Sequence, residues 1–519
     1  MLSFIQNNLS KFILIGGSIL ALITFYLFSR FTVDDAFITW RYGINFVDHG
    51  FWSYNPVGYD ITQSYTNALI AFLSLVPAFF ELDVVFFFKL LSVIFVFAFS
   101  FFLIRESNFK TSSIILLILF FCFPITIIHL FSGLETFYFV ALMGLLFIHI
   151  DKQNYKISTI LVIILMLLRP EAWTLALLFP LYYFISFKEK NSNNQTPSSD
   201  FIFVISVPIF LLIYLFMNYL YFDYFLPNSF YIKSSNIFSF FNFIFFSYHL
   251  LPILIFIFLK KIKLSLLMTT FFIIIIFQYS GSELIMNYAN RFSFHIIAPI
   301  YIYAIFITSK DSGNIIIEAK DIFLNKYSFK LSYVFAVICF LHAASLFLTS
   351  RAELVHLANY YPRAQFSHSE FGNVLKNLKN ENKIKSFSIS DAGMAAYYSG
   401  IPNLDTIGLG SSLVAHSSGV SEEVIEVYRP DIIAFRTNAN HEVKEIERYK
   451  FLMEYVESEK LYPICNIYTS MNYSVYIYSK IKAAEISQHC ENSKNFNYVS
   501  DRDFFFTHNL KPPWAFWNE

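Results

Sequence analysis

The sequence predicts a polytopic α-helical membrane protein that carries an α/β domain outside the membrane at its C-terminal end. Hydrophobic residues make up 56% of the 519 residues and charged residues 14%, whereas charged residues make up about 25% of a typical soluble domain. A soluble globule with so much apolar side chain could not cover its surface with polar groups. Long apolar runs recur up to residue 350, and the composition then becomes polar.

The apolar runs predict about eleven transmembrane helices, because an untilted span needs about 20 apolar residues. The first run is too long for the core of a signal peptide and lacks a small-residue cleavage site, so we expect it to remain as a span. The runs cover residues 12–31, 84–104, 112–130, 136–150, 157–168, 172–187, 201–221, 237–258, 264–279, 292–309 and 331–349.

Basic residues predict the orientation of these spans. Lys and Arg gather in alternating loops, as at Arg105 and Lys110, and such loops face the cytoplasm. The N-terminus is then inside, and the chain after Ser350 is outside. The shorter apolar run 65–80 would invert the later loops if it crossed the membrane. We therefore expect a juxtamembrane or re-entrant segment there; the alternative is a true span that violates the charge rule.

Two domains follow from this topology. Residues 1–350 are expected to form the transmembrane domain, with juxtamembrane helices in a first outer loop at 32–83, and residues 351–519 the extracytoplasmic α/β domain. Short apolar runs typical of strands alternate in the second domain with helical stretches. The predicted strands cover 386–390, 431–435 and 473–478, and the predicted helices cover 421–428 and 441–458.

Charge and cysteine content exclude other classes of protein. Lys and Arg number 37, as do Asp and Glu, so the chain has no basic excess with which to bind nucleic acid. Four cysteines are too few for a disulfide scaffold. Cys465 and Cys490 lie in the outer domain, where either a bridge or two free thiols would fit. No cysteine spacing indicates a metal site.

The first outer loop carries the strongest candidate for chemistry. Asp34 and Asp35 open a predicted interfacial helix whose apolar stripe includes Phe37 and Trp40. Two adjacent carboxylates raise one pKa, which suits a general base. The alternative is that Asp34 only caps the helix, which is common for Asp at this position.

Seven sequence blocks occur in an order that resembles bacterial GT-C glycosyltransferases. The nearest resemblance is to the arabinofuranosyltransferase-like and related polyprenyl-phosphate-sugar-dependent enzymes. The blocks are DDAFITWRYGINFVDHGFWSYNP from Asp34, SYTNAL at 64–69, SGLETFYF at 132–139, RPEAW at 169–173, YFDYFLPNSFY at 221–231, NRFSFHIIAP at 290–299 and DAGMAAYYSGIPNLDTIGL at 391–409.

The resemblance implies a GT-C fold in the bacterial cytoplasmic membrane and a transferase chemistry. A polyprenyl-phosphate sugar would be the donor, and lipopolysaccharide, another envelope glycan or a protein the acceptor. Configuration would invert in a single displacement, with Asp34 or Asp35 as the general base. No cofactor is certain, and a divalent cation stays open. The phosphate-binding candidates are Arg169, Lys233, Arg291 and His295, and the acceptor or pocket candidates are Arg41, Tyr65, Asn67, Glu135 and Asn228.

Several of these candidates have a structural alternative. Arg169 and Glu171 could form a mutual ion pair, and Lys233 could snorkel to the lipid headgroups. Glu135 could bind an ion or the acceptor, but its position before a helix favours capping. Asp391 matches the resembled family, and a turn after a strand explains it equally well.

Arg41 and Arg291 have alternatives of the same kind. Pairing with Asp34 or Asp48 is slightly favoured for Arg41. Arg291 and His295 stand four residues apart at the outer end of a predicted span. No acidic residue follows Arg291 within four positions, so a phosphate is expected as its partner rather than a lipid headgroup alone.

Two other classes of function are disfavoured by where the polar residues lie. A transporter or flippase of lipid-linked sugars or polysaccharides should place polar groups near the bilayer midplane and often shows repeated halves. The polar blocks instead fall in segments on one side. A membrane-anchored binding or sensor protein would not need about eleven spans. The sequence therefore favours the glycosyltransferase.

Overall fold

The computed structural model describes most of the chain as helices joined by short loops. The described residues are 2–56, 58–190, 200–234, 237–253, 261–284, 286–310, parts of 337–359, 368–417, 419–437, 446–470 and 473–479. They form two compact units, neither of which is continuous in sequence. The first comprises Met1–Ser29, Phe88–Phe216 and Ser234–Leu357, and the second comprises Arg30–Phe87, Met217–Lys233 and Ala358–Glu519.

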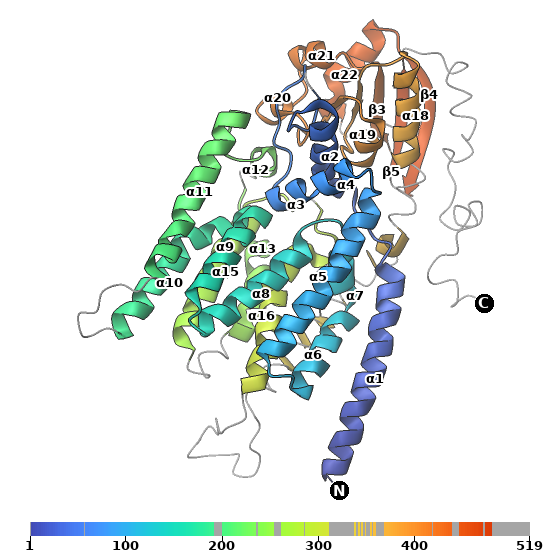
Figure 1. Cartoon of the computed structure of the whole chain (residues 1–519). Coiled ribbons are helices and arrows are strands. Elements are labelled where there is room, and N and C mark those ends of the chain that lie inside the picture. The colour runs from blue at the N-terminus through green and yellow to red at the C-terminus, as the bar shows by residue number, and fades with distance from the viewer. Residues whose placement is uncertain are drawn as a thin grey trace, which may run out of the picture. The chain divides into compact units, whose positions relative to one another are not determined.

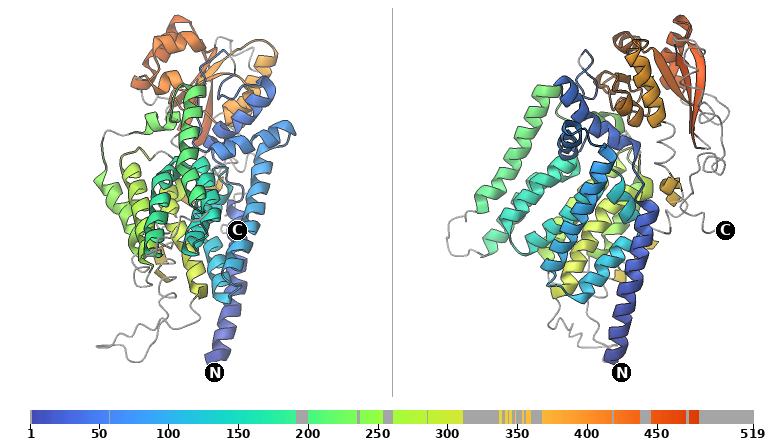
Figure 2. Two further views of the ribbon diagram at one scale, coloured as in Figure 1. Left: turned by 60° about the vertical axis from the view of Figure 1, so that its left-hand side comes forward. Right: turned by 45° about the vertical axis from the view of Figure 1, so that its right-hand side comes forward.

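The first unit is a bundle of apolar helices. In Figures 1 and 2, α5, α6, α8 and α16 run roughly parallel, with α8 packed against α9 and α16, and α6 packed against α1. The helices that lie wholly or mostly in this unit are α1 (Leu2–Phe28), α5 (Val84–Glu106), α6 (Thr111–Cys122), α7 (Pro124–Phe131), α8 (Thr136–Asp151), α9 (Tyr155–Leu168), η1 (Pro170–Thr174), α10 (Leu175–Lys190), α11 (Asp200–Phe222), α13 (Phe240–Ser247), η2 (Tyr248–Ile253), α15 (Ile262–Ser280), η3 (Tyr288–Asn290) and α16 (Arg291–Lys310).

Four segments of the described chain are long and apolar enough to cross a membrane: Val84–Glu106, Asp200–Phe222, Ile262–Ser280 and Tyr288–Ser309. A fifth is added if α6 and α7, which meet at an angle of 72°, form one broken span. Pro124 begins α7, and proline cannot continue the hydrogen bonding of the helix before it.

The chain is therefore a helical membrane-embedded protein, and the higher number of about eleven spans stays a prediction. Two of the remaining expected spans form apolar helices that are shorter than the about 20 residues of an untilted span, since α8 has 16 residues and α9 has 14. The expected span 331–349 falls mainly outside the described residues. Large apolar side chains of α5 and α11 are exposed, such as Phe97 at 72% and Ile202 at 73%, as expected for faces in contact with lipid.

The apolar run 65–80 forms two short helices in the second unit. α3 (Ala68–Leu73) has six residues and α4 (Leu75–Phe79) has five, so neither alone could span a bilayer. Both pack against α2 (Asp34–His49). The backbone N–H of Gly43 in α2 donates to Ser74 Oγ at 3.1 Å, and a Cβ on Gly43 would overlap Ser74. This close approach requires glycine at position 43.

The second unit contains a five-stranded mixed sheet in the order β2-β1-β3-β5-β4. β1 pairs in parallel with β2 and β3, while β5 pairs antiparallel with β3 and β4. The strands are β1 (Phe387–Ile389), β2 (Asn403–Leu404), β3 (Ile432–Thr437), β4 (Tyr462–Ser470) and β5 (Tyr473–Ser479), and the remaining helices are α12 (Asn228–Lys233), α18 (Glu370–Asn380), α19 (Met394–Ser399), α20 (Ser412–Ala415), α21 (Glu422–Tyr428) and α22 (Ile446–Ser458).

The three strands and two helices expected near the C-terminus are present. They correspond to β1, β3 and β5 and to α21 and α22, although α22 is described only from Ile446. Neither β2 nor β4 was expected from the sequence. The sheet also shares its compact unit with residues 30–87 and 217–233, which the sequence analysis placed with the transmembrane part.

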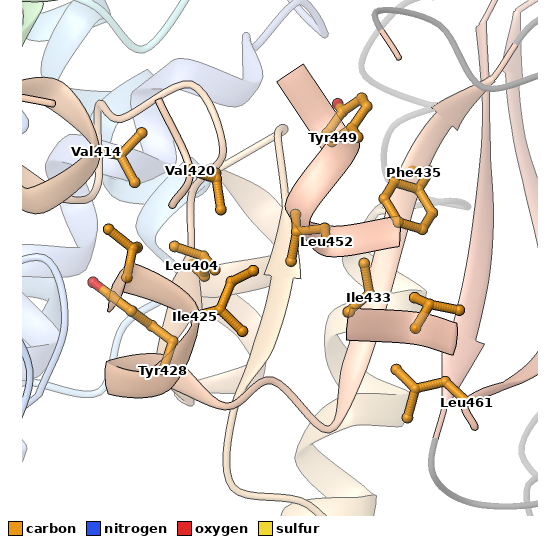
Figure 3. Close-up of a cluster of buried hydrophobic side chains, with 12 residues drawn as sticks. Leu404, Val414, Val420, Ile425, Tyr428, Ile433, Phe435, Tyr449, Leu452 and Leu461 are labelled. Carbon is orange, nitrogen blue, oxygen red and sulfur yellow. The ribbon is translucent and has the colours of Figure 1, made fainter. Parts of the chain in front are cut away.

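A hydrophobic core stabilises this sheet and its helices. Figure 3 shows Leu404 of β2 and Ile433 and Phe435 of β3 beside Ile425 of α21 and Leu452 of α22, all of them buried. Full burial of a side chain of this size contributes about 1.5–3 kcal/mol. β1 pairs with both β2 and β3, which contribute to this core, and the turn that follows β1 carries Asp391 of the candidate site.

Candidate functional site

Asp34 and Asp35 are the first two residues of α2, as the sequence predicted. The residue at the N-cap is Val33, which makes no side-chain capping bond. The Asp34 carboxylate instead accepts hydrogen bonds from the backbone N–H groups of Gly393 at 3.0 Å and Met394 at 2.7 Å. Asp34 thus satisfies N–H groups at the start of α19 rather than capping its own helix, and the capping alternative is wrong for α2.

The Asp-Ala-Gly turn after β1 is shaped to receive this carboxylate. Gly393 lies against Asp34, and a Cβ there would overlap both the backbone oxygen and the carboxylate of Asp34. The glycine is therefore required by the close approach of two segments that are far apart in the sequence.

Burial raises the pKa of Asp34 to about 6, and the neighbouring carboxylates of Asp391 and Asp35 add to this effect. His368 and the N–H of Met394 act in the opposite direction. From the sequence, we expected a raised pKa because of charge repulsion within the Asp pair. The direction agrees, but desolvation is the largest cause and Asp35 the smallest of the five.

His368 completes this cluster, and it was not among the residues predicted from the sequence. Its Nε2 atom lies 2.8 Å from Asp391 Oδ2. No spacing signal connects His368 with Asp34 or Asp391. The Asp-Ala-Gly sequence at Asp391 was the one available signal, and a turn after a strand explains it equally well.

Arg41 is buried in the same unit and makes its contacts with backbone carbonyls. Its Nε donates to Tyr54 O at 2.7 Å, and its Nη2 donates to Ile401 O at 2.6 Å. The guanidinium also lies 4.7 Å from the centre of the Tyr54 ring, a distance typical of a cation–π contact. Within the described part of the chain, Arg41 forms no ion pair with Asp34 or Asp48, so the favoured alternative is wrong.

The other pocket candidates of the second unit bind its loops to one another, and the phosphate candidate Lys233 lies in the same unit. Tyr65 Oη accepts from Trp52 Nε1 at 3.0 Å, and Asn67 Oδ1 accepts from Thr39 Oγ1 at 3.0 Å. Asn228 Nδ2 donates to Gly408 O at 3.1 Å. Lys233 is the last residue of α12 and is half-buried.

The first unit contains a separate ionic network built around Glu135. Arg291 Nη2 lies 2.8 Å and Arg169 Nη1 lies 2.5 Å from the same Glu135 oxygen, Oε1. Arg291 Nε also donates to Thr136 Oγ1 at 2.9 Å. The expectation that Arg291 lacks an acidic partner is therefore wrong, because Glu135 reaches it from a loop that is distant in sequence.

Glu135 occupies the N-cap position of α8 without capping it. Its side chain makes no capping bond and is 1% exposed between the two guanidinium groups. The preferred capping role is thus wrong. Two buried cations beside one carboxylate explain why this side chain turns away from the helix end.

Glu171 and His295 extend the same network. Arg169 pairs with Glu171, as the structural alternative anticipated. Tyr279 Oη donates to Glu171 Oε1 at 3.1 Å and lies 2.8 Å from His295 Nδ1. His295 Nε2 is buried and has no hydrogen-bond partner among the described residues. The network therefore has two Arg, two Glu and an imidazole with one unused nitrogen.

The predicted site residues fall into two groups. The first unit holds Arg169, Arg291, His295 and Glu135, and the second holds Asp34, Asp35, Arg41, Tyr65, Asn67, Asn228 and Lys233. No cluster of His, Cys, Asp and Glu suited to a metal ion occurs in the described ranges. The side chain of Cys465 and all of Cys490 lie outside the described residues.

The comparisons with known proteins identify no family. No protein-family model matches the chain, and no curated protein matches it either. The resemblance to GT-C glycosyltransferases therefore stays a prediction from the ordered sequence blocks, and the geometry of the two groups of residues is the basis for a proposal.

Proposed function

We propose that the chain is a membrane glycosyltransferase that moves a sugar from a polyprenyl-phosphate donor to an envelope glycan or another acceptor. The observation that carries the proposal is the cluster of Asp34, Asp35, Asp391 and His368, in which the pKa of Asp34 is raised to about 6. Asp35 is the more exposed carboxylate of the pair, and a positioned carboxylate can take the proton of a hydroxyl group in general base catalysis. The ordered blocks that resemble GT-C enzymes support the same chemistry.

The reaction needs a base, and the structure distinguishes the two carboxylates. The acceptor oxygen bonds to the anomeric carbon while the bond from that carbon to the phosphate oxygen breaks. The bonding electron pair leaves with the phosphate, and the base takes the hydroxyl proton. Asp34 is buried against the start of α19, whereas Asp35 is half-buried. We assign the proton-accepting role to Asp35 and a supporting role to Asp34.

The leaving phosphate needs cations, and Arg169 and Arg291 are the candidates in the first unit. Each guanidinium now interacts with Glu135, which a phosphate could replace as the anion. Arginine suits this exchange because its planar donors bind carboxylate and phosphate in the same geometry. Such charge stabilisation is worth several kcal/mol at a site with little water.

The proposal includes a location. The transfer would take place on the outer face of the bacterial cytoplasmic membrane, with about eleven spans and an extracytoplasmic C-terminal part. The distribution of Lys and Arg among the loops supports this topology.

Transfer of a labelled sugar tests the proposed function directly. Membranes from a strain that lacks the gene would receive the purified full chain and undecaprenyl phosphate carrying a radiolabelled pentose, hexose or N-acetylhexosamine. We expect label to enter membrane glycan from one donor and undecaprenyl phosphate to be released in equal amount. Movement of an intact donor across vesicles without release of undecaprenyl phosphate would instead identify a flippase and contradict the proposal.

A further inference from the structure

α3 and α4 expose a row of large apolar side chains on the second unit. The exposed side chains are Phe72, Val76, Phe79 and Phe80, the last of them at 71%. Their spacing of four, three and one residues places them on one face of a helical segment. Both helices pack against α2 (Figure 1), and Pro77 and other residues between the exposed positions are buried. The row is therefore the outer face of a segment whose inner face is already occupied.

Aromatic residues from two other segments extend this row. The ring of Trp52 stacks on that of Phe72 with centres 5.1 Å apart. The backbone N–H of Trp52 donates to Tyr221 Oη at 3.1 Å, and Tyr221, near the end of α11, is exposed. All these residues belong to the second unit. We call them the apolar face, which consists of Trp52, Phe72, Val76, Phe79, Phe80 and Tyr221.

A candidate span begins directly after this face. α5 starts at Val84, and the turn between Phe80 and Val84 carries the exposed residues Glu81 and Asp83. Charged side chains are costly to move into the hydrocarbon of a bilayer, so this turn lies at the membrane surface. Phe80 directly precedes the turn and lies at the same level.

The start of the segment is fixed to α2. The side chain of Asn67, just before α3, accepts a hydrogen bond from Thr39, and Ser74 accepts one from the backbone of Gly43. α3 and α4 together would be only about 18 Å long, whereas the hydrocarbon core is about 30 Å thick. A segment bound to α2 along its length and ending at the surface lies along the membrane rather than entering it deeply.

The exposed apolar surface continues onto the two spans that join the second unit. Phe86 of α5 and Leu220 of α11 belong to this unit and are both exposed. Such faces of spans contact lipid, and an apolar patch continuous with them would be unfavourable in water. Trp52 and Tyr221 add rings with one polar atom each, a type of side chain that is enriched where lipid meets water. These features favour lipid as the partner.

We propose that the apolar face binds the lipid bilayer and holds the second unit on the membrane surface. Its side chains lie in the boundary between headgroups and acyl chains, in the leaflet at which α5 begins. α3 and α4 are then an interfacial anchor and not a crossing. This inference requires a membrane-embedded chain and does not depend on the transfer of a sugar.

The depth of spin labels in lipid nanodiscs tests this anchor in the full chain. Single cysteines would be introduced after the four native cysteines are replaced by serine. Collisions of each label with oxygen, which concentrates among acyl chains, and with a water-soluble nickel chelate give its depth. Labels at Phe72→Cys and Phe80→Cys should lie about 5–10 Å below the lipid phosphates. Ile94→Cys, on an exposed position of α5, gives a reference about 15 Å deep.

An exposed phenylalanine outside the apolar face provides the matched control. Phe451 lies on α22 in the same unit and is exposed, so a label at Phe451→Cys should collide mainly with the nickel chelate. Labels at Phe72 and Phe80 that behave like this control would overturn the inference. Labels as deep as that at Ile94 would show a crossing or a re-entrant segment and would also overturn it. Labels protected from both reagents would show that protein covers the face, which is equally incompatible with the inference.

A second measurement keeps the native cysteines. Benzoylphenylalanine would replace Phe80 or Phe451 and be irradiated in nanodiscs of a single phospholipid. We expect the mass of one phospholipid to be added at position 80 but not at position 451. A variant that elutes like the wild type and gains no lipid at position 80 would contradict the inference. Neither measurement uses sugar transfer, so a protein that binds lipid here but transfers no sugar would refute the proposed function alone.

Discussion

At the scale of single residues, Asp34 shows how position changes the task of a carboxylate. The sequence indicated the Asp pair as the candidate general base but did not distinguish Asp34 from Asp35. In the structure Asp34 bonds to two backbone N–H groups at the start of α19, while Asp35 is half-buried. A sequence pattern cannot reveal this difference, because the partners of Asp34 are more than 350 residues away.

Substitution should separate the two aspartates. Asp35→Asn should leave folding intact and lower turnover about 10²–10⁴-fold, the usual effect of losing a general base. Asp34→Asn should lower the stability by about 1–3 kcal/mol as well, because two buried N–H groups lose a charged acceptor. Transfer rates and thermal unfolding of both variants in nanodiscs check this. Near-normal turnover in both variants would contradict the assignment of the pair.

The raised pKa of His368 also predicts a pH dependence of stability. A histidine whose pKa is raised by folding stabilises the protein fully below its unfolded pKa of about 6.5, and this contribution is lost as the pH rises through the folded value. Thermal unfolding from pH 6.5 upward should therefore show a loss of stability in the wild type that His368→Gln lacks. Starting there avoids most of the titration of Asp34, whose pKa is about 6. Parallel curves for both proteins would show that His368 carries no charge in the folded state.

At the scale of elements, periodicity and local composition predicted the strands and helices that depend on residues near each other in sequence. They missed the elements that depend on pairing with a distant segment. The apolar stretches of β1, β3 and β5 were recognisable as strands. β2 has two residues and exists because it pairs with β1, so it has no local pattern of its own. The same limit applies to Glu135, whose position before α8 indicates a cap, although two distant guanidinium groups determine where its carboxylate points.

The ionic network predicts unequal costs for its two acidic residues. Glu135→Gln leaves Arg169 and Arg291 without their shared anion, and breaking a buried pair in this way costs about 3–5 kcal/mol. Glu171→Gln should lower the stability less. In the described part of the chain, Glu171 is 12% exposed and forms an ion pair with Arg169 but not with Arg291. Folded yield and unfolding temperature of the purified variants provide the measurement. Equal losses would show that Glu135 is not the centre of the network.

Arg291 tests whether the network also binds the donor. Arg291→Lys keeps the positive charge and can still pair with Glu135, so folding should be close to normal. Lysine lacks the planar donors that hold a phosphate at two points, so the KM for the donor should rise about tenfold or more and turnover should fall. If this variant expresses normally and keeps both donor affinity and turnover, Arg291 has a structural role only.

At the scale of the whole molecule, composition was enough to predict a helical membrane protein but not how the chain divides. Exposed apolar faces on α5 and α11 follow directly from the excess of hydrophobic residues. The grouping of residues 30–87 and 217–233 with the C-terminal sheet does not, because it depends on hydrogen bonds such as that from Asn55 Nδ2 to Asn403 O at 3.1 Å. Hydrogen bonds between polar side chains and distant backbone groups leave no periodic pattern in the sequence, so they could not be predicted from it.

The membrane topology is the last prediction, and it concerns the whole chain. An N-terminus in the cytoplasm and about eleven spans place everything after Ser350 outside, since Lys and Arg then lie in cytoplasmic loops. A reporter enzyme that works only outside the cytoplasm, fused at Glu519, should be active, and a fluorescent protein that matures only in the cytoplasm should stay dark there. Fusions at Ser107 and Asn154, which lie in basic loops, should give the reverse result and serve as controls. A fluorescent fusion at Glu519 would instead mean that the number of spans is even, and the segment 65–80 would then be the first place to look for the additional crossing.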